Sequence, residues 1–429
     1  MRPMSKLFTA AIALTALSLP VGAVAQSNGA DTSVSDNSSE QAPTSPPVAE
    51  RRDYSFTTHG ITLSDPYHWL KDPSYPTVDD EDVLAYVKAE NAWFEAQMAP
   101  HKELVDTLFE EMKGRIKEDD STVPQKDGDW LYWSEFEEGK EYRLHKNLAT
   151  GELLPDELTN LRGGLTWVAN DSALVYGPST EEWRTLEAKL HVIGTPVDDD
   201  VTLYKEEDES FGVGTGLTAQ EDWLVIATGD NETSEIRLVS ADNPTGEQIL
   251  VKPRQKGVEY DVDVRDGTLF VHTNDNHINF RLATAPLANP GEWTTLIEGS
   301  DEFYLTDFEL FKDFYVTEGR LAGLDQVQLR AYDDADDMTP IRFPEASFVA
   351  GLSNNPEYDM QKLRLSYQSM VTPGSVYDYD VKTGALELLK QQEIPSGYDA
   401  TLYKTERLTI TARDGTQVPV SVVTRKDRP

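Results

Sequence analysis

The sequence predicts an all-β fold, a β-propeller of four-stranded blades preceded by a short α-helical extension. An apolar residue followed by alternating polar and apolar positions recurs six times, at spacings of 46, 46, 44, 49 and 48 residues. The six copies start at Leu144, Leu190, Ile236, Phe280, Leu329 and Tyr377. A second apolar run precedes each copy by a nearly constant interval, at 130–133, 174–176, 223–226, 269–271, 314–316 and 363–367. A period in the forties without i, i+3, i+4 spacing is typical of propeller blades.

Residues 1–25 predict a secretory signal peptide. Arg2 and Lys6 are followed by an apolar stretch over 7–19 and by the small-residue site Ala23-Val24-Ala25. The apolar stretch is too short to span a bilayer, and no other stretch reaches the roughly 18 apolar residues that a span needs. We therefore expect cleavage after Ala25 and a soluble mature protein, exported across the inner membrane to the periplasm.

The next two segments differ in composition and in apolar periodicity. Residues 26–50 are rich in Ser, Asp, Gln, Asn and Pro and predict a disordered tether. Residues 51–121 predict a helical extension with two apolar stripes at helical spacing, one before and one after Pro100. The stripes consist of Leu84, Val87, Asn91, Phe94 and Met98, and of Leu104, Leu108, Met112 and Ile116. An amphipathic extension must lie against something apolar, either the propeller rim or another domain.

Composition restricts the function classes. The chain has 38 basic and 76 acidic residues, a formal net charge of -38, which disfavours binding to nucleic acid or to anionic membranes. Such a field would attract cationic peptides or metal ions, although a surface that confers solubility is the simpler interpretation. The absence of cysteine from the sequence excludes disulfides and thiol chemistry.

The polar clusters predict no metal or cofactor site. His59 and His68, on either side of Asp65, match no zinc spacing. The acidic runs 198–200 and 333–337 lack the Gly and the terminal Glu of a calcium loop, so solvated loops are expected there.

Other candidate residues have structural interpretations. Asp275, Asn276 and His277 have the chemistry of a hairpin turn. Five tryptophans at or beside the predicted strands are interpreted as blade packing rather than as a sugar or peptide platform. They are Trp130, Trp133, Trp167, Trp223 and Trp293.

Short segments along the chain resemble a known family. They include Asp65-Pro66-Tyr67-His68-Trp69-Leu70, the segment 115–124, Trp130-Leu131-Tyr132-Trp133, the segment 257–262 and Val376-Tyr377-Asp378-Tyr379. In order and spacing over residues 54–429 they resemble the N-terminal region of the prolyl oligopeptidase family, and they are most similar to oligopeptidase B. Members are serine peptidases in which a seven-bladed propeller caps an α/β-hydrolase domain and restricts access to short peptides.

The resemblance implies that the catalytic half is absent from this sequence. The propeller would occupy residues 122–400, and 401–429 would begin the strand that leads into the missing hydrolase domain. The sequence contains no G-x-S-x-G elbow. Ser353 and Ser375 lack the following glycine and are expected in turns between strands. No catalytic, cofactor-binding or metal residue is therefore assigned.

The sequence departs from the family in its number of blades, because it has six signatures where the family has seven. Residues 141–143, which would end one blade, are followed at once by a stretch that would end the next, so one blade is predicted to be deleted here. The six blades would close into a smaller ring or leave open edges that promote self-association. Tyr142 and Arg143 adjoin the deletion, so no role facing a peptide is inferred for them.

Lys117, Glu118, Asp119 and Asp120 lie where the family has the hinge between its domains. Two interpretations stay open, ion pairs that hold a domain interface shut and the mixed charges of a helix end. The resemblance implies that this chain is the substrate-gating propeller of an oligopeptidase B-like serine endopeptidase. Such an enzyme would act on short peptides and cleave them after basic residues. This chain alone is expected to be inactive. The alternatives are a stand-alone propeller that binds peptides or a protein partner, and the product of a decayed gene.

Overall fold

The computed structural model describes residues 45–75, 77–128, 130–140, 144–147, 156–159, 161, 164–334 and 337–428. The predicted signal peptide, most of the predicted tether, and Tyr142 and Arg143 lie outside these residues. The chain divides into two compact units between Ile116 and Lys117, with 394–396 assigned to the smaller, N-terminal unit.

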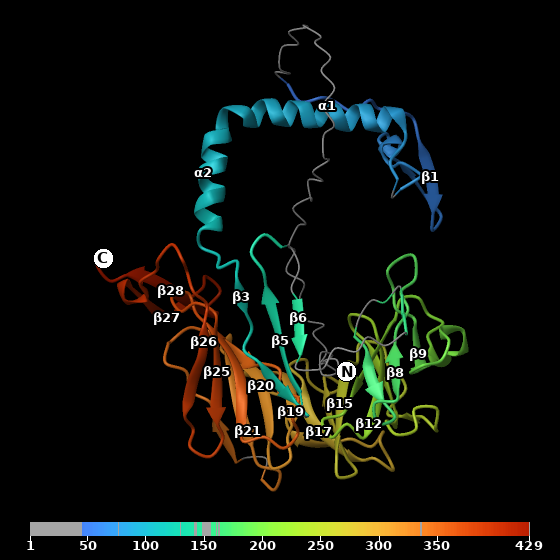
Figure 1. The fold of residues 1–429 in the computed structure, drawn as a ribbon, viewed down its shortest axis with the longest axis vertical. Helices are drawn as coiled ribbons and strands as arrows, with labels where there is room; N and C mark the ends of the chain where they lie inside the picture. The colour runs from blue at the N-terminus through green and yellow to red at the C-terminus, as the bar shows by residue number, and fades with distance from the viewer. Residues whose placement is uncertain are drawn as a thin grey trace. The chain divides into compact units, whose positions relative to one another are not determined.

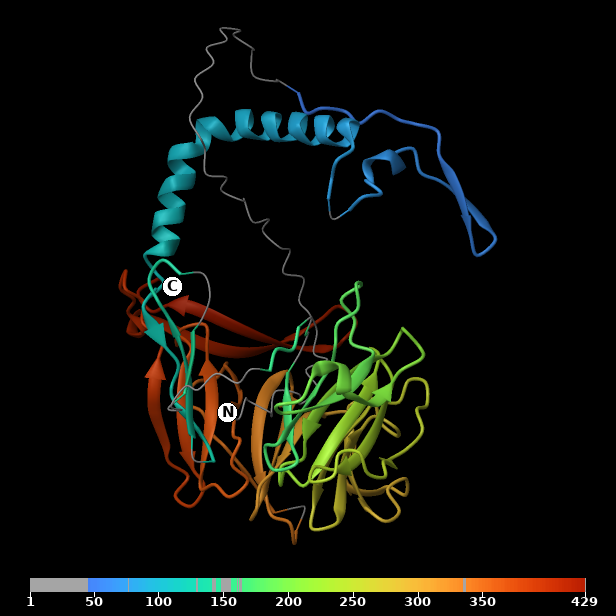
Figure 2. The same cartoon turned by 45° about the vertical axis from the view of Figure 1, so that its right-hand side comes forward.

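The smaller unit contains the two predicted helices and a hairpin that the sequence did not predict (Figures 1 and 2). Its elements are β1 (Ser55–Thr58), β2 (Ile61–Ser64), η1 (His68–Leu70), α1 (Glu81–Met98), η2 (Ala99–His101) and α2 (Lys102–Lys113). Oδ1 of Asp80 caps α1 by accepting hydrogen bonds from the amides of Asp82 (2.9 Å) and Val83 (3.1 Å). Pro100 has no amide hydrogen for a continuing helix, so the chain changes direction at η2.

The larger unit is a six-bladed β-propeller, and each blade is a four-stranded antiparallel sheet (Figure 1). The first blade consists of β3 (Asp120–Ser121), β4 (Gln125–Asp127), β5 (Trp130–Phe136) and β6 (Leu144–Asn147). The second consists of β7 (Thr166–Val168), β8 (Ala173–Tyr176), β9 (Glu187–Val192) and β10 (Val201–Lys205). The third consists of β11 (Gly212–Leu217), β12 (Trp223–Gly229), β13 (Ser234–Ser240) and β14 (Ile249–Leu250). The fourth consists of β15 (Tyr260–Arg265), β16 (Thr268–Thr273), β17 (Arg281–Pro286) and β18 (Thr294–Ile297). The fifth consists of β19 (Phe303–Leu310), β20 (Tyr315–Leu321), β21 (Leu324–Arg330) and β22 (Met338–Pro340). The sixth consists of β23 (Val349–Leu352), β24 (Lys362–Gln368), β25 (Ser375–Asp380) and β26 (Leu386–Gln391).

The repeated sequence runs form the middle of the blades. In the second to sixth blades, the apolar run belongs to the second strand and the repeated signature to the third, although Phe314 and Phe280 each stand just before their strand. The first blade is built differently, because β3 and β4 pair one after the other along the same edge of β5. Its other edge pairs with β6.

The hydrophobic core lies between adjacent blades. Val175 and Leu190 of the second blade pack with Leu224 of the third, and similar clusters join each following pair of blades. Burial on both faces explains why β8 and β16 are nearly continuous apolar runs. In β16, for example, Leu269 and Val271 are completely buried.

The first and last blades are linked by charged side chains. Nζ of Lys117 lies 2.9 Å from Oε1 of Glu393, and Nζ of Lys390 lies 2.7 Å from Oδ1 of Asp120. The predicted hinge residues Lys117 and Asp120 thus form ion pairs, and both pairs lie within the larger unit.

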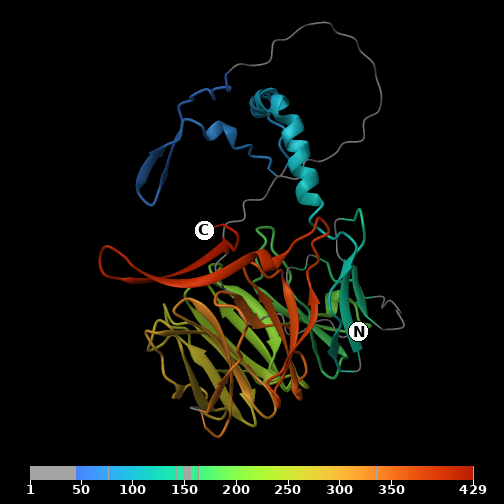
Figure 3. The same ribbon diagram turned by 90° about the vertical axis from the view of Figure 1, so that its left-hand side faces the viewer.

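A long hairpin follows the sixth blade. It consists of β27 (Tyr403–Thr411) and β28 (Gln417–Arg425), preceded by η4 (Ala400–Leu402), and Figure 3 shows it running past the edge of the propeller. Leu408, Ile410 and Val418 on this hairpin are exposed. The hairpin occupies the residues predicted to lead out of the propeller.

Candidate functional site

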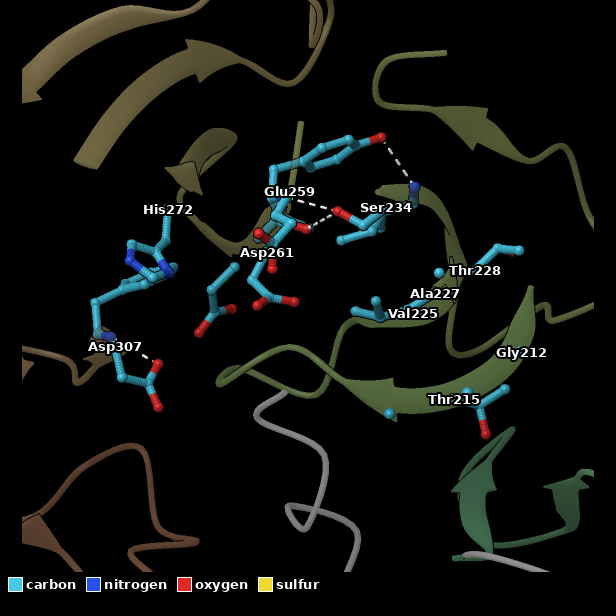
Figure 4. A pocket seen from close by; sticks show the side chains of 18 of the residues that line it. Gly212, Thr215, Val225, Ala227, Thr228, Ser234, Glu259, Asp261, His272 and Asp307 are labelled. Carbon is cyan, nitrogen blue, oxygen red and sulfur yellow. Dashed lines mark hydrogen bonds between the residues drawn. The ribbon is translucent and has the colours of Figure 1, made fainter. Parts of the chain in front are cut away.

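A cavity of about 740 Å³ lies within the propeller. Its wall is formed mainly by the first strands of the third, fourth and fifth blades, β11, β15 and β19, together with residues 353–355 after β23. First strands line the central channel of a propeller, so the cavity is part of that channel. Figure 4 shows Glu259, Asp261 and Asp307 toward one side of the cavity, and Gly212 and Thr215 toward the other.

Strand β11 has no side chain at three of the positions that line the cavity. Gly212, Gly214 and Gly216 alternate along it and all line the cavity. A Cβ added at Gly216 would meet no atom within 4 Å, because open space lies above that residue. Glycine in a strand interior often marks a place where another molecule approaches the backbone closely.

The facing strands make the wall acidic. Period-two alternation places Glu259, Asp261 and Asp263 on one face at β15, and Asp307 and Glu309 come from β19. Together with Asp230, these are six acidic lining residues. No Lys or Arg is present among the described residues that line the cavity.

The carboxylates differ in their hydrogen bonds. Oδ1 of Asp263 accepts from the amides of Ala219 (2.9 Å) and Val264 (2.7 Å). Oδ1 of Asp307 accepts from the amide of Phe308 at 2.7 Å. The side chain of Asp261 makes no hydrogen bond or ion pair with another described residue.

Burial raises the pKa of Asp261, Asp307 and the nearby Glu318. Burial, assisted by the nearby charge of Glu259, raises the pKa of Asp261 to about 6. Burial and then the charge of Glu318 raise the pKa of Asp307 well above its usual value, with a further contribution from Asp261. Glu318, whose Oε1 accepts from the amide of Leu352 at 2.7 Å, has its pKa raised by burial to about 7.

Aromatic side chains cover the neighbouring part of the wall. His272 is buried, its Nε2 lies 3.0 Å from the carbonyl oxygen of Leu305, and its ring stacks on Phe280 at 4.6 Å. Burial lowers the pKa of His272 to about 4, so the imidazole is neutral at pH 7 and adds no positive charge. Tyr304 and Phe308 complete this aromatic side.

The histidines considered as metal ligands lie in the smaller unit. His59 occupies the β1–β2 turn with φ of 50°, and the ring of His68 stacks on Tyr54 at 3.7 Å. Nδ1 of His68 is 3.8 Å from Oδ2 of Asp65. In the described ranges, no group of three or more His, Asp or Glu is arranged to hold a metal ion.

The polar clusters of the propeller turn out to be structural. Asp275 lies between β16 and β17 and receives hydrogen bonds from Nε (2.8 Å) and an Nη (2.9 Å) of Arg281. The expectation that Asp198–Asp200 is solvated is wrong for Asp200, whose side chain is completely buried against His191 and Tyr176. In the other run, Ala335 and Asp336 lie outside the described residues.

Two of the tryptophans and one of the two serines belong to the packed blades. Trp167 is buried in β7, and the rings of Trp293 and Tyr260 meet edge to face at 5.1 Å. Ser375 does not lie in a turn as predicted, because it is the buried first residue of β25. Ser353 directly follows β23 and lines the cavity.

Sequence reasoning missed Asp261 and Asp307. The alternation Tyr260-Asp261-Val262-Asp263-Val264 was a signal, since it places two carboxylates on one face of a strand. The sequence could not say that this face lines the central channel, because that requires the arrangement of three blades.

A model of the family "Prolyl oligopeptidase, N-terminal beta-propeller domain" matches residues 46–147 and 145–392. The chain is 32% identical to dipeptidyl aminopeptidase BI of Pseudoxanthomonas mexicana, with 90% of the chain and 63% of that protein covered. It is 24% identical to protease 2 of Moraxella lacunata, with 88% and 63% covered. Its fold is similar to that of oligopeptidase B from Trypanosoma brucei, with a TM-score of 0.80 and 26% identity over 89% of this chain and 65% of that one.

The relatives contain residues that have no counterpart here. The alignment with dipeptidyl aminopeptidase BI extends over 461 positions, more than the 429 residues of the chain. The two matched segments of the family model meet at 145–147, where the sequence predicts the deletion. The chain spans 63% of the length of these two curated relatives. It belongs to the prolyl oligopeptidase family and carries that family's N-terminal β-propeller domain.

Proposed function

We propose that this chain is the substrate-gating propeller of an oligopeptidase B-like serine endopeptidase that acts on short peptides. The observation that carries this proposal is a central cavity of about 740 Å³ within a propeller of this family. A cavity of this size accommodates a ligand as large as a short peptide but excludes a folded protein. The propeller would therefore select substrates by size.

The catalytic groups would come from a hydrolase domain joined to this propeller in a longer protein. Acyl transfer by a serine hydrolase needs a nucleophilic serine, a histidine base and an orienting carboxylate, and the sequence contains no G-x-S-x-G elbow. Two sets of exposed apolar side chains offer such a domain contact surfaces. They are Leu104, Leu108, Phe109 and Met112 on α2, and Leu408, Ile410 and Val418 on the hairpin β27–β28.

The size of the native product tests this proposal. An antibody against residues 160–390 should detect a species much larger than the 48.0 kDa of this chain. The 429-residue chain itself should not hydrolyse a fluorogenic peptide with arginine before the cleaved bond. Turnover by this chain that a serine-reactive inhibitor abolishes would contradict the proposal that the catalytic groups come from a separate hydrolase domain.

A stand-alone binding propeller is the second candidate, favoured by a cavity whose described lining comes entirely from the propeller unit. In that case the native product would have the size of residues 26–429. The apolar residues of α1 and α2 would then be protected from amide exchange, whereas in the peptidase they would exchange rapidly without the hydrolase domain.

We also propose that the protein is exported to the periplasm. The support is the charged, apolar and small-residue order of residues 1–25. N-terminal sequencing of the periplasmic fraction should find a chain that starts at Gln26. A cytoplasmic product that retains residues 1–25 would refute the proposal.

A further inference from the structure

We propose that Trp183 is a ligand-binding residue, whose indole ring at one mouth of the central cavity stacks on an aromatic side chain of a bound peptide. This inference rests on the proposed function, because it takes a short peptide as the ligand. It adds a contact that depends on stacking and not on charge, and it names the class of side chain that this contact favours.

The indole ring of Trp183 is accessible from the cavity. The residue lines the cavity and is 70% exposed. Among the other aromatic lining residues that the structure describes, Tyr304 is 39% exposed, and Tyr260 and Phe308 are buried. A tryptophan that packs in a core has most of its surface covered, so Trp183 retains a large apolar face that a ligand can cover.

The backbone at Trp183 has a conformation that favours glycine, with a φ of 63°. Its amide donates to the carbonyl oxygen of Thr180 at 3.0 Å, and the amide of Thr180 donates to the carbonyl oxygen of Arg184 at 2.8 Å. These bonds form a three-residue hairpin loop, in which the last residue is left-handed and is commonly glycine. A tryptophan in this position is strained, and strain of this kind is concentrated at functional sites.

Further contacts hold this loop in place. The amide of Arg184 donates to Oγ1 of Thr180 at 3.2 Å, and the guanidinium of Arg184 donates to the carbonyl oxygen of Glu209. Ser179 and Thr185 form a β-bridge at the base of the loop. The indole ring therefore stands on a fixed support, so little freedom is lost when a ligand binds to it.

Phe280 in the fourth blade has the same local backbone geometry. Its φ is 62°, and its amide donates to the carbonyl oxygen of His277 at 3.0 Å. Among the described non-glycine residues with positive φ, Trp183 and Phe280 are the only tryptophan and phenylalanine, and both line the cavity. Each stands in the connection between the second and third strands of its blade, so both lie toward the same face of the propeller.

The chain leaves the last blade at this same face. Strand directions alternate within an antiparallel blade, so the second and fourth strands end on the same side. The second strand β8 ends just before the loop that carries Trp183, and the fourth strand β26 ends before the hairpin β27–β28. Trp183 therefore lies on the side at which the proposed hydrolase domain would be joined and a peptide would be held for cleavage.

The surroundings of the loop suit a peptide with an aromatic side chain. The amide of Val213 donates to the carbonyl oxygen of Thr185 at 2.9 Å, so the loop lies beside β11. Gly212 and Gly214 on either side of Val213 line the cavity and leave the strand open to the close approach of a peptide. Ring stacking adds to the affinity gained from apolar contact, so an aromatic side chain is favoured over an aliphatic one.

The test is calorimetric titration of the 429-residue chain with two uncharged peptides, acetyl-Gly-Ala-Tyr-Ala-Gly-amide and acetyl-Gly-Ala-Ala-Ala-Gly-amide. We expect the tyrosine peptide to bind at least about fivefold more tightly. Trp183→Ala should remove this preference, and Trp183→Phe, which keeps a ring, should retain most of it. Tyr75→Ala, which removes an exposed ring outside the cavity, should leave the preference unchanged.

A second measurement separates binding from a structural role. Trp183→Gly relieves the left-handed backbone, so its thermal unfolding midpoint should equal or exceed that of the parent chain while the tyrosine preference is lost. A midpoint lowered by more than about 3 °C would show that Trp183 is needed for packing.

Three other results would also overturn the inference. They are the absence of measurable binding of the tyrosine peptide, equal affinity for the two peptides, and an undiminished preference in Trp183→Ala. Because the assay needs no hydrolysis, such a failure would leave the proposed gating function to be decided by the size of the native product.

Discussion

Nδ1 of His191 lies 2.7 Å from Oδ1 of Asp200, and both side chains are completely buried in the second blade. Nε2 of the same ring lies 3.0 Å from Oδ1 of Asp156. Because both ring nitrogens face carboxylate acceptors, the imidazole must carry two protons to donate to both. Burial by itself would lower the pKa of His191, but the hydrogen bonds with Asp156 and Asp200 outweigh it and raise the pKa above its usual value.

The first prediction concerns stability against pH. A histidine whose pKa is raised by folding stabilises the protein fully below its unfolded pKa of about 6.5, and this contribution is lost as the pH rises through the folded pKa. His191→Gln should therefore lower the free energy of unfolding by about 3 kcal/mol at pH 6 and by less at pH 9. Urea unfolding at the two pH values measures the loss in free energy of unfolding. His101→Gln, a substitution at an exposed histidine, is the control. Equal losses at both pH values would show that His191 is not charged in the folded protein.

The second prediction concerns the ion network between the second and third blades. Arg254 lies 2.6 Å from Glu206 and 3.5 Å from Glu235, and its guanidinium covers the ring of Phe211 at 4.3 Å. Arg254→Met would leave two mostly buried carboxylates with one partner fewer, so we expect a loss of about 3 kcal/mol in urea unfolding. Lys256→Met, at an exposed position, should cost little. A loss below about 1 kcal/mol for Arg254→Met would refute the importance of this network.

The third prediction uses a close approach in the fifth blade. A Cβ at Gly319 would lie 2.6 Å from the carbonyl oxygen of Tyr304 and would overlap the ring of Phe303. Gly319→Ala should therefore destabilise the propeller by about 1–3 kcal/mol. Gly216→Ala introduces the same methyl group where no atom lies within 4 Å, and should leave the unfolding midpoint nearly unchanged. Similar midpoints for both variants would contradict the overlap at Gly319.

The fourth prediction concerns the link between the first and last blades. Oε1 of Glu357 in the last blade accepts from the amide of Gly128 at 2.7 Å and lies 3.1 Å from Nζ of Lys126. Glu357→Gln should cost less than about 1 kcal/mol in global stability, because Lys126 is exposed and water screens its attraction to Glu357. Amide exchange in β4 and β5 should nevertheless become faster, while exchange in β12 and β13 stays the same. Glu387→Gln, which breaks the pair with Lys362 inside the sixth blade, is the control. Unchanged exchange in β4 and β5 would mean that other contacts hold the first blade.

Prediction from the sequence was most accurate where the signal is local. The alternation at Leu190 and Ile236 and the runs at Leu174 and Leu269 identified the second and third strands, because one blade's pleat repeats in every copy. The hairpin β1–β2 was not predicted, since its strands are entirely exposed and carry no buried face. The division of the first strand into β3 and β4 was also missed, because only pairing with β5 reveals it.

The sequence by itself determined the six blades, the two helices and the family, because strand alternation, helical stripes and turn residues are recorded within each short segment. Only the tertiary structure decided which acidic residues are buried, paired or left facing the cavity. Asp200 is buried because His191 and Tyr176 of the same blade close over it, and Asp261 faces the channel because three blades place their first strands around it. Burial and charge pairing depend on neighbours that are distant in sequence, which no local pattern specifies.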